Sequence, residues 1–369
     1  MHVYYLTLVF VFVTAFLAQD TRSNPISVAE HAPSANPLQN IKASSMFVFL
    51  AFLALFLVAG LRWKVGTDYQ QYSQLYWSYS RVPLNELLSL RISNLGLFGI
   101  RAISIISRYL YDDPASMFLL ASLITIGLSV RHISKSSSMF LFSIMLFIFG
   151  GSWHGSFNGM RQSLATAVIF AGSGFMMRRE FWKYLLVVLA AVLFHSSAFV
   201  MLPIYFIAGR KIDYRQWAML IAITVFMISS YDVLFKISEI LLDKEVAATL
   251  PYMTRRVNSL RVAASWAPIL LYFMVRKVYG KDAESNFYMN MLIITAMLKV
   301  GTMNSAYLMR VTGYTGVFMP LALPKILACF EKRSALLLKL FILGLYAIFW
   351  YVEISKTPEL RNFRFIFAR

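Results

Sequence analysis

The sequence predicts an all-α fold: a polytopic transmembrane helical bundle of about ten to twelve helices that forms one integral membrane domain over residues 1–369. Hydrophobic residues make up 59% of the chain and charged residues only 14%, against roughly 25% in ordinary soluble domains. Long apolar runs recur along the chain, at Val3–Ala18, Met46–Leu61, Leu185–Ala208 and Leu336–Val352. Runs of this length cross a bilayer as helices rather than as barrel strands.

The chain begins with an apolar run that ends in Ala-Gln, as a secretory signal peptide does. The run lacks a basic n-region and further apolar runs follow it, so we expect Met1–Ala18 to be an uncleaved first helix. The stretch Asp20–Lys42 contains Pro25, Pro33 and Pro37 and is the least hydrophobic part of the sequence. It predicts a loop between the first two helices.

The formal charge of +18 comes from basic residues that cluster mainly between apolar runs, where they orient a chain in the membrane. No basic stretch is interleaved with stacking aromatic residues on a polar surface, so we expect no nucleic-acid partner. Cys329 is the single cysteine, which excludes an intramolecular disulfide and a thiolate-rich metal site. Because HExxH, paired-His and DxD patterns are absent from the sequence, we expect neither a metal nor a cofactor.

The run Leu185–Ala208 lies between two basic clusters, at Lys183 and Arg210, that both indicate the cytoplasmic side. A single crossing would place the two clusters on opposite sides of the membrane. The His195-Ser-Ser sequence in the middle of the run therefore predicts a break, with a re-entrant hairpin or two short helices. Non-helical backbone at membrane depth is tolerated only where it is buried in protein or lines a wet cavity. The break is thus a candidate site.

Residues 62–113 are predicted to form an outer interfacial segment. Arg101 and Arg108 lie seven residues apart within the apolar stretch Ile92–Tyr111 and share one face, which is typical of an amphipathic interfacial helix. Residues 236–262 are predicted to form an outer amphipathic loop. With this topology the unusual polar residues of the sequence come to one outer face of the membrane.

The turn that follows the second apolar run carries the first candidate residues. Gly66 permits a tight turn, and Thr67 or Asp68 can cap the next helix. One interpretation is a capped interfacial helix with an aromatic belt. The other makes Asp68 a base and gives Tyr69 and Tyr72 a place in a surface that stacks on sugars. Spacing alone favours the first interpretation without excluding the second.

Two further candidates are arginines at the start of apolar helices. Arg161, followed by Gln162, lies in a first helical turn, where exposed backbone N–H groups favour an anion and a cation opposes the helix dipole. Phosphate binding explains that placement, and snorkelling of the side chain to the interface is the alternative. Arg310 begins a later run, and its fork of donors suits phosphate oxygens.

His195 is the candidate within the predicted break. A lone histidine in an apolar run most often makes a hydrogen bond between helices. The neighbouring hydroxyl groups and the topology argument favour a second interpretation, in which His195 is an acid, a base or a phosphate contact.

These four motifs, in this order, resemble the EpsG family of Wzy-like polysaccharide polymerases. The matching residues are R-x-x-x-G-T-D-Y at Arg62–Tyr69 with Tyr72, R-Q-x-L-A at Arg161–Ala165, F-H-S-S-A at Phe194–Ala198 with Pro203, and Arg310 with Tyr314 and Pro320. The resemblance extends over about two-thirds of the chain. The stretch Asp20–Lys42 departs from it, because it is longer and less basic than expected between the first two helices.

The resemblance implies a metal-independent membrane glycosyltransferase of the GT-C type in the bacterial cytoplasmic membrane, with its active site facing outward. Such an enzyme transfers a glycan from a polyprenyl-pyrophosphate carrier to a sugar hydroxyl of another lipid-linked repeat unit. The partners implied are this lipid-linked oligosaccharide, membrane lipids and a chain-length regulator protein. Residues 236–262 would then cover the site or guide an anionic glycan, unless they form a plain surface loop.

In this scheme the catalytic residues are Arg161 and either Asp68 or His195. Arginine cations offset the charge that develops on the pyrophosphate leaving group, and a carboxylate or imidazole accepts the proton of the acceptor hydroxyl. The sequence does not decide between Asp68 and His195 as the base. The residues expected to bind pyrophosphate or glycan are Arg62, Arg161, Gln162, Arg310, Tyr69, Tyr72 and Tyr314.

Three other functions are compatible with parts of the sequence. An O-antigen ligase-like transferase would use similar arginine–pyrophosphate chemistry and differ in its acceptor. A polysaccharide flippase or transporter would show repeat-related halves and central cavity charges, and no repeat stands out in this sequence. A membrane O-acyltransferase would rest on His195 alone.

Overall fold

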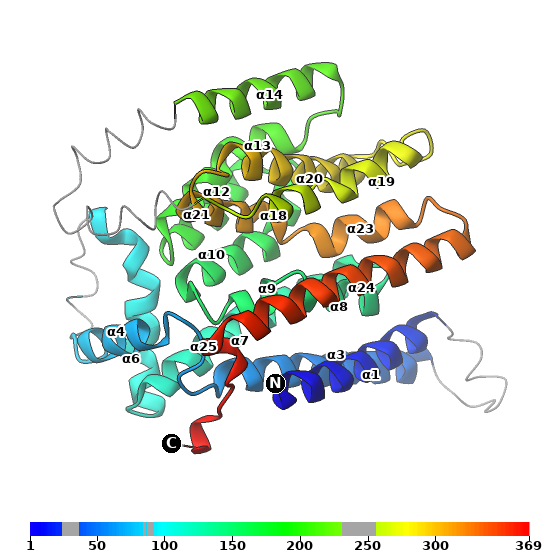
Figure 1. Ribbon diagram of the computed structural model, residues 1–369. Coiled ribbons are helices and arrows are strands. Elements are labelled where there is room, and N and C mark those ends of the chain that lie inside the picture. Colours follow the sequence, from blue (N-terminus) through cyan, green and yellow to red (C-terminus); the bar gives the residue numbers. More distant parts are fainter. Residues whose placement is uncertain (24–36, 84–85, 87–91, 231–255, 369) are drawn as a thin grey trace. The chain divides into compact units, whose positions relative to one another are not determined.

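The computed structural model describes residues 1–23, 37–83, 86, 92–230 and 256–368. Figure 1 shows helices joined by turns and loops. An isolated antiparallel bridge joins Arg62 and Phe365. The predicted all-α class is confirmed. The bridge follows from two extended segments at opposite ends of the chain, and it belongs to the region around the candidate site.

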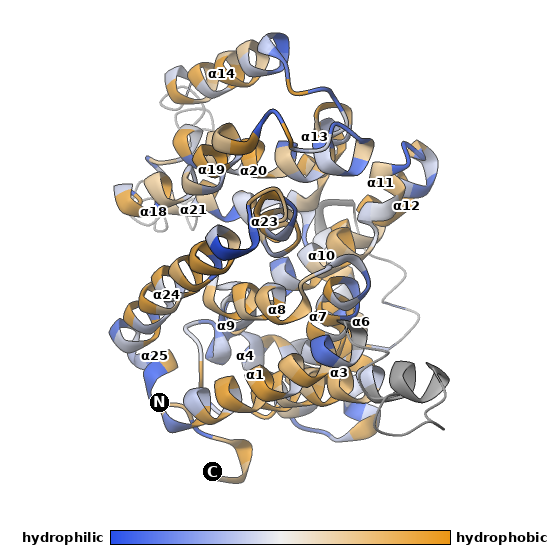
Figure 2. Ribbon diagram, turned by 90° about the vertical axis from the view of Figure 1, so that its right-hand side faces the viewer, coloured by the Kyte–Doolittle hydropathy of each residue, from blue (hydrophilic) through white to orange (hydrophobic). Residues whose placement is uncertain are grey.

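Three helices among the described residues are long and apolar enough to cross a membrane: α1 (His2–Ser23), α7 (Pro114–Ser136) and α24 (Lys332–Lys356). Figure 2 shows α24 as hydrophobic over most of its length. Many of its apolar side chains are exposed, including Leu340 and Phe341, which is expected of a helix that contacts lipid. The chain is therefore a membrane protein. The other apolar helices are shorter, because breaks divide several of the predicted runs.

The loop predicted after the first helix is shorter than expected. Helix α1 continues through Ser23, and α3 (Pro37–Gly60) begins inside the stretch Asp20–Lys42. Proline fits the first turn of a helix, because its fixed φ is helical and its missing N–H has no partner there in any case. The predicted loop was therefore too long at both ends, and residues 24–36 lie outside the described residues.

The chain divides into two compact units. The first contains Met1–Gly172, Leu186–Phe199 and Arg333–Arg369, and the second contains Ser173–Leu185 and Val200–Lys332. Each unit has its own buried core. The prediction of one membrane domain over the whole chain stays a prediction.

The first unit is built on α3, which packs against α1 and α7. Helix α7 in turn packs against α6 (Phe98–Leu110) and α10 (Met160–Ala171). Gly60 lets α3 approach α7 closely, since a Cβ there would lie 3.1 Å from Leu119 Cα. Helices α8 (Phe140–Phe149), α9 (Ser152–Gly155) and α24 also belong to this unit. The order of these contacts brings the start of α10 beside α6 and α7.

The second unit surrounds α20 (Ala283–Gly301), most of whose residues are buried. Around it pack α13 (Met201–Ala208), α14 (Tyr214–Ser229), α19 (Ala267–Val275), α22 (Gly313–Gly316) and α23 (Met319–Leu327). Asn290 on α20 donates hydrogen bonds to the carbonyls of Ala208 (2.9 Å) and Arg210 (2.8 Å). Gln216 donates to Asn290 Oδ1 at 3.2 Å. This buried network satisfies carbonyls that the end of α13 leaves without helical partners.

The predicted break in the run Leu185–Ala208 is present. Helix α12 (Phe181–Val192) ends before His195, and the 3-10 helix η2 (Ser196–Val200) leads into α13. The two helices form a hairpin, because rings at the start of α12 contact the ring of Tyr205 near the end of α13. Arg179 also donates to the Tyr205 carbonyl at 2.6 Å. The chain thus returns toward its starting point, as two short helices.

The described residues of the segment 62–113 form several short elements, and none of these helices is long enough to be a candidate span. Helix α4 (Tyr69–Tyr79) follows the turn, and the 3-10 helix η1 (Ile92–Leu97) leads into α6. The 13 residues of α6 extend about 20 Å, less than the thickness of a hydrocarbon core. Its location at a membrane interface stays a prediction. Of the predicted amphipathic loop 236–262, residues 236–255 lie outside the described residues.

We expect Asn290→Ala to destabilise the second unit, because it removes the donor that satisfies two buried carbonyls. The cost is about 1–3 kcal/mol, measured as a lower midpoint of thermal unfolding of the purified protein in a fixed detergent. Asn286→Ala is the matched control on the same helix, since its amide also donates two bonds to carbonyls, but in contact with water. Equal losses in the two variants would contradict this role.

Candidate active site

The candidate site lies in the first unit, around the N-terminal end of α10. Four segments meet there: the turn at residues 62–68, helix α4, the η1–α6 segment and the break at His195. Each is held by hydrogen bonds between main chain and side chains rather than by apolar packing alone.

The turn after α3 is fixed to the loop that precedes α10. Asn158 Oδ1 accepts a hydrogen bond from Thr67 N (2.7 Å), and Asp68 Oδ2 accepts one from Gly159 N (2.8 Å). Gly66 has a φ of +102°, and a Cβ there would lie 2.6 Å from the Phe157 carbonyl oxygen. Glycine is therefore required at this position for both its backbone conformation and its small size.

The sequence suggested that Asp68 could cap α4, but its side chain makes no capping hydrogen bond there. It occupies the residue before α4, but its backbone (φ −94°, ψ 2°) lies outside the extended region in which a side chain can reach back to the helix N–H groups. Its carboxylate instead accepts bonds from Gly159 N and, at 3.0 Å, from the Thr67 hydroxyl. Asp68 thus connects the turn to the start of α10 and remains partly exposed.

Arg161 connects three segments. Its main-chain N–H donates to the Tyr72 hydroxyl (3.3 Å), its Nε to the Phe194 carbonyl (3.2 Å) and its Nη2 to the Gly96 carbonyl (2.8 Å). Phe194 lies just past the end of α12, where carbonyl groups lack helical partners and arginine is a suitable donor. A guanidinium has five N–H groups. Two are engaged with the described residues, so three are left to bind a ligand.

The η1–α6 segment packs directly on the break. Gly99 N donates to the Leu193 carbonyl at 2.7 Å, and a Cβ at Gly96 would lie 2.8 Å from Ser196 N. A Cβ at Gly99 would collide with the Phe194 ring. The two glycines therefore allow this close approach. His195, half-buried between Phe194 and the exposed Ser196, lies one residue from the carbonyl that holds Arg161.

Arg62 is enclosed in the protein, with 1% of its surface exposed. Its guanidinium lies between the rings of Phe118 (4.7 Å) and Phe157 (5.1 Å), and Nη1 donates to the Ala59 carbonyl. Nε and Nη2 are buried and make no hydrogen bond with the described residues. Burial lowers the pKa of Arg62 to about 10, so it stays charged at neutral pH. Its predicted contact with pyrophosphate stays a prediction.

The tyrosines of α4 are part of the core. Tyr69 is 3% exposed and stacks on Phe118 with 4.3 Å between ring centroids, and Tyr72 is 7% exposed. Their rings are therefore not an open surface for sugars in this conformation. The hydroxyl of Tyr72 reaches the start of α10, where it accepts the bond from Arg161 N.

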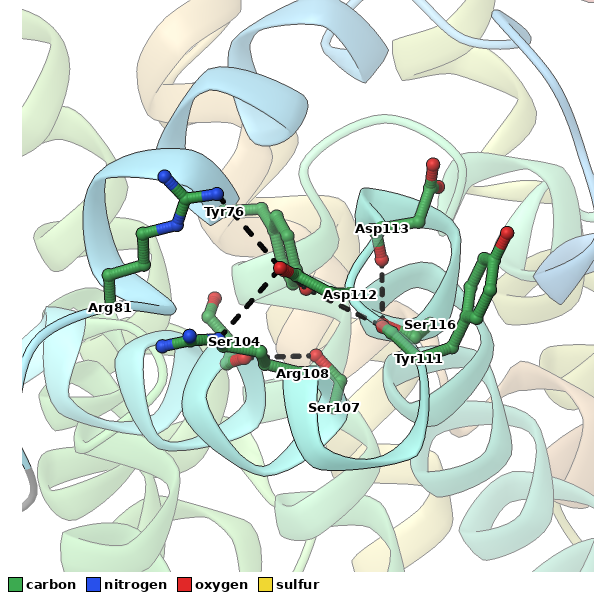
Figure 3. Close-up of polar contacts among 9 residues, drawn as sticks. All are labelled: Tyr76, Arg81, Ser104, Ser107, Arg108, Tyr111, Asp112, Asp113 and Ser116. Carbon is green, nitrogen blue, oxygen red and sulfur yellow. Dashed lines mark hydrogen bonds and ion pairs between the residues drawn. The ribbon is translucent and has the colours of Figure 1, made fainter.

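Asp112, which is not among the predicted site residues, holds the C-terminal end of α4. Figure 3 shows Asp112 beside the Tyr76 hydroxyl, which donates to its Oδ1 at 3.0 Å, with Arg81 and Arg108 on either side. Burial and the bond to Asp112 raise the pKa of Tyr76 to about 12, so the hydroxyl remains a donor. The Asp-Asp-Pro sequence that starts α7 was the available signal.

A second pair outside the predicted site joins α9 to the last long helix. His154 Nε2 lies 3.4 Å from Glu353 Oε2 on α24. His154 is buried, and its Nδ1 makes no hydrogen bond with the described residues. The pair stabilises the loop that carries Asn158 and Gly159. A buried histidine in a glycine-rich loop is the sequence signal that was overlooked.

The remaining predicted residues are divided between the two units. Gln162 is half-buried beside Arg161 in the first unit. Arg310 is exposed at the start of a 3-10 turn (Arg310–Thr312) in the second unit, and Tyr314 is fully buried in α22. Within the described ranges, no three His, Cys, Asp or Glu side chains are grouped to hold a metal ion. The site of the first unit is thus built from Asp68, Tyr72, Arg161 and His195.

This arrangement suits an anionic substrate. The three N–H groups of the Arg161 guanidinium that remain unused among the described residues can bind phosphate oxygens at the start of α10. A carboxylate and an imidazole, each a possible proton acceptor, lie on segments bonded to the same turn.

Comparison with known proteins gives one match. The sequence profile described as the EpsG family matches residues 45–366, which is most of the chain and includes every predicted site residue. Neither a curated protein nor a solved structure matches the chain.

We expect Gly66→Ala to loosen the turn at Asp68, because alanine is strained at this φ and its Cβ meets the Phe157 carbonyl. The cost is about 1–3 kcal/mol. The measurement is the thermal midpoint, together with the labelling rate of a cysteine placed at Thr67 in a Cys329→Ser background, which should rise. Gly344→Ala is the control, since a Cβ there meets nothing within 4 Å. Unchanged labelling in the Gly66 variant would exclude this constraint.

Proposed function

Because the chain belongs to the EpsG family of polysaccharide polymerase-type membrane proteins, we propose that it polymerises lipid-linked oligosaccharide repeat units. The donor is a glycan on a polyprenyl-pyrophosphate carrier, and the acceptor is a sugar hydroxyl of another lipid-linked unit. The protein acts in the bacterial cytoplasmic membrane with its site facing outward, among membrane lipids and with a chain-length regulator protein as a further partner.

The observation that supports this proposal is the position of Arg161 and its hydrogen bonds. Its guanidinium is oriented by two carbonyls, keeps three N–H groups for a ligand and lies in the first turn of α10. A doubly bonded arginine is already oriented, so it loses little conformational freedom when a pyrophosphate binds. Gln162 in the same turn is a second donor to the pyrophosphate.

The reaction forms one bond and breaks another. The acceptor hydroxyl oxygen attacks the anomeric carbon of the donor sugar, the bond from that carbon to the pyrophosphate oxygen breaks, and its electron pair stays on the pyrophosphate. The hydroxyl proton passes to a base. Arginine cations stabilise the charge that develops on the leaving group, in the role that a metal ion has in other transferases.

Asp68 and His195 are both retained as bases. Asp68 lies on the turn bonded to Gly159, two residues before Arg161, and His195 follows the carbonyl that binds the Arg161 side chain. Arg310, Tyr314, Tyr69, Tyr72 and Arg62 keep their proposed contacts with pyrophosphate or glycan from the family resemblance. Of these, Arg62 acts from within the core, where its guanidinium lies between the rings of Phe118 and Phe157.

Arg161→Ala is expected to reduce polymerisation by about 10²-fold or more, because it removes both the cation and the bonds that orient the break. Arg161→Lys keeps the charge without the fork and should retain partial activity. The measurement is glycan chain length on gels, with Arg178→Ala as the control, since that exposed arginine contacts Glu180 and the Phe175 ring, away from the candidate site. Loss of long chains with single repeats still exported supports a polymerase. Loss of export altogether would favour a flippase and reject the proposal.

Asp68→Asn and His195→Gln should identify the base. Asparagine keeps an oxygen that can accept the bond from Gly159 N, so Asp68→Asn preserves the turn while removing the basic group. The variant of the true base is expected to lose activity by about 10²–10⁴-fold with an unchanged thermal midpoint. The variant of the other residue should remain within about tenfold of the parent. Full activity in both variants would contradict the assignment of the base to these residues.

A further inference from the structure

The C-terminal segment returns to the turn after α3 and pairs with it. Trp63 N donates to the Arg364 carbonyl (2.8 Å), Ile366 N to the Leu61 carbonyl (2.9 Å) and Gly66 N to the Glu359 carbonyl (3.1 Å). These bonds join the turn after α3 and the C-terminal segment in one wall. The Tyr4 hydroxyl, which donates to the Leu360 carbonyl at 3.0 Å, fixes the segment from the other side.

Between the turn and the C-terminal segment lies a cavity of about 260 Å³. It is lined by Trp63, Lys64, Pro358, Glu359, Asn362 and Arg364. This volume lies just below the range of pockets that bind drug-sized molecules, which begins near 300 Å³, so the occupant is small, of the size of one sugar ring. The walls come from two segments bonded to each other through the main chain, so the cavity is largely preformed.

The polar side chains of this cavity have no partners among the described residues. The side chains of Lys64, Glu359, Asn362 and Arg364 make no hydrogen bond or ion pair there, although the Lys64 ammonium lies 5.5 Å from the centre of the Trp63 ring. Two cations, one carboxylate and one amide are therefore available around an indole wall. Such a set offers donors and acceptors in several directions.

Lys64 is held in an unfavourable conformation. Its φ is +51°, in the left-handed region that favours glycine, and among the described non-glycine residues only Arg179 shares this feature. The cost to an ordinary residue is about 1–2 kcal/mol. The bonds of Trp63 N and Gly66 N on either side fix the backbone here. This strained backbone beside the cavity points to a binding role for the Lys64 ammonium.

We propose that this cavity is a binding subsite for an acidic sugar residue of the glycan. The indole forms an apolar wall for a pyranose ring, Arg364 and Lys64 pair with the carboxylate of the sugar, and Asn362 and Glu359 bind its hydroxyls. Phosphate would not need the indole, and a neutral sugar would not need two cations. The subsite rests on the proposed function and deepens it, because the same turn carries the subsite and Asp68.

The test measures binding by the full-length protein in lipid nanodiscs, without any need for polymerisation. The acidic probes are tetragalacturonate and a hyaluronan tetrasaccharide, maltotetraose is the neutral probe, and inorganic pyrophosphate is the competitor. We expect at least one acidic probe to bind at least tenfold more tightly than maltotetraose. Arg364→Gln should weaken that binding by about tenfold or more. Arg361→Ala is the matched control, since this exposed arginine of the same segment does not line the cavity.

Lys64→Gly separates a binding role from a structural one. Glycine relieves the strain at φ +51°, so the thermal midpoint should rise while binding of the acidic probe weakens. Equal binding by the parent and by the Arg364 and Lys64 variants would overturn the proposal, as would the absence of binding by both acidic probes. Displacement by equimolar pyrophosphate would assign the cavity to phosphate instead. Loss of repeat export in Arg161→Ala would reject the proposed function, whereas binding of the acidic probe would still test this subsite by itself.

Discussion

The bonds of the Arg161 guanidinium to the Phe194 and Gly96 carbonyls are the interaction on which the site depends. A helix that stops within an apolar run leaves carbonyls without partners, and lipid supplies none. The side chain of Arg161 satisfies such a carbonyl and brings η1, α10 and the break together. The same bonds orient the guanidinium, so the residue that permits the break is also ready to bind an anion. Fold and proposed chemistry therefore depend on one side chain.

The turn at Gly66 is the second fixed point, and two other segments hold it. Asn158 and Gly159 bind it from the loop before α10, and the C-terminal segment binds it through Glu359. Asp68 thus accepts a hydrogen bond from Gly159 N that holds the turn in place, whether or not it also accepts a proton in catalysis. A role in catalysis can be recognised only in a variant that keeps this bond. The buried guanidinium of Arg62 holds one end of this region in the core. The hydrogen bond from the Tyr76 hydroxyl to Asp112 holds the other end.

Much of the fold could be predicted from the sequence, because apolar runs and their interruptions are local signals. The break at His195 followed from charge clusters on both sides of a single run, and Gly66 followed from the need for a tight turn. The burial of Arg62 could not be predicted, since its cage is made by Phe118 and Phe157 from distant segments. The stacking of Tyr69 on Phe118 could not be predicted for the same reason. Pairing of the C-terminal segment with Trp63 likewise depends on main-chain bonds that leave no pattern of residue types.

The most direct test is a structure of the protein in lipid nanodiscs with bound undecaprenyl pyrophosphate. The measured quantity is the distance from the guanidinium nitrogens of Arg161 to the nearest phosphate oxygen. The account predicts hydrogen-bond contact, roughly 2.7–2.9 Å, with the Phe194 and Gly96 carbonyls still bound to the same side chain. A pyrophosphate bound elsewhere, with Arg161 engaged only with the main chain, would contradict it.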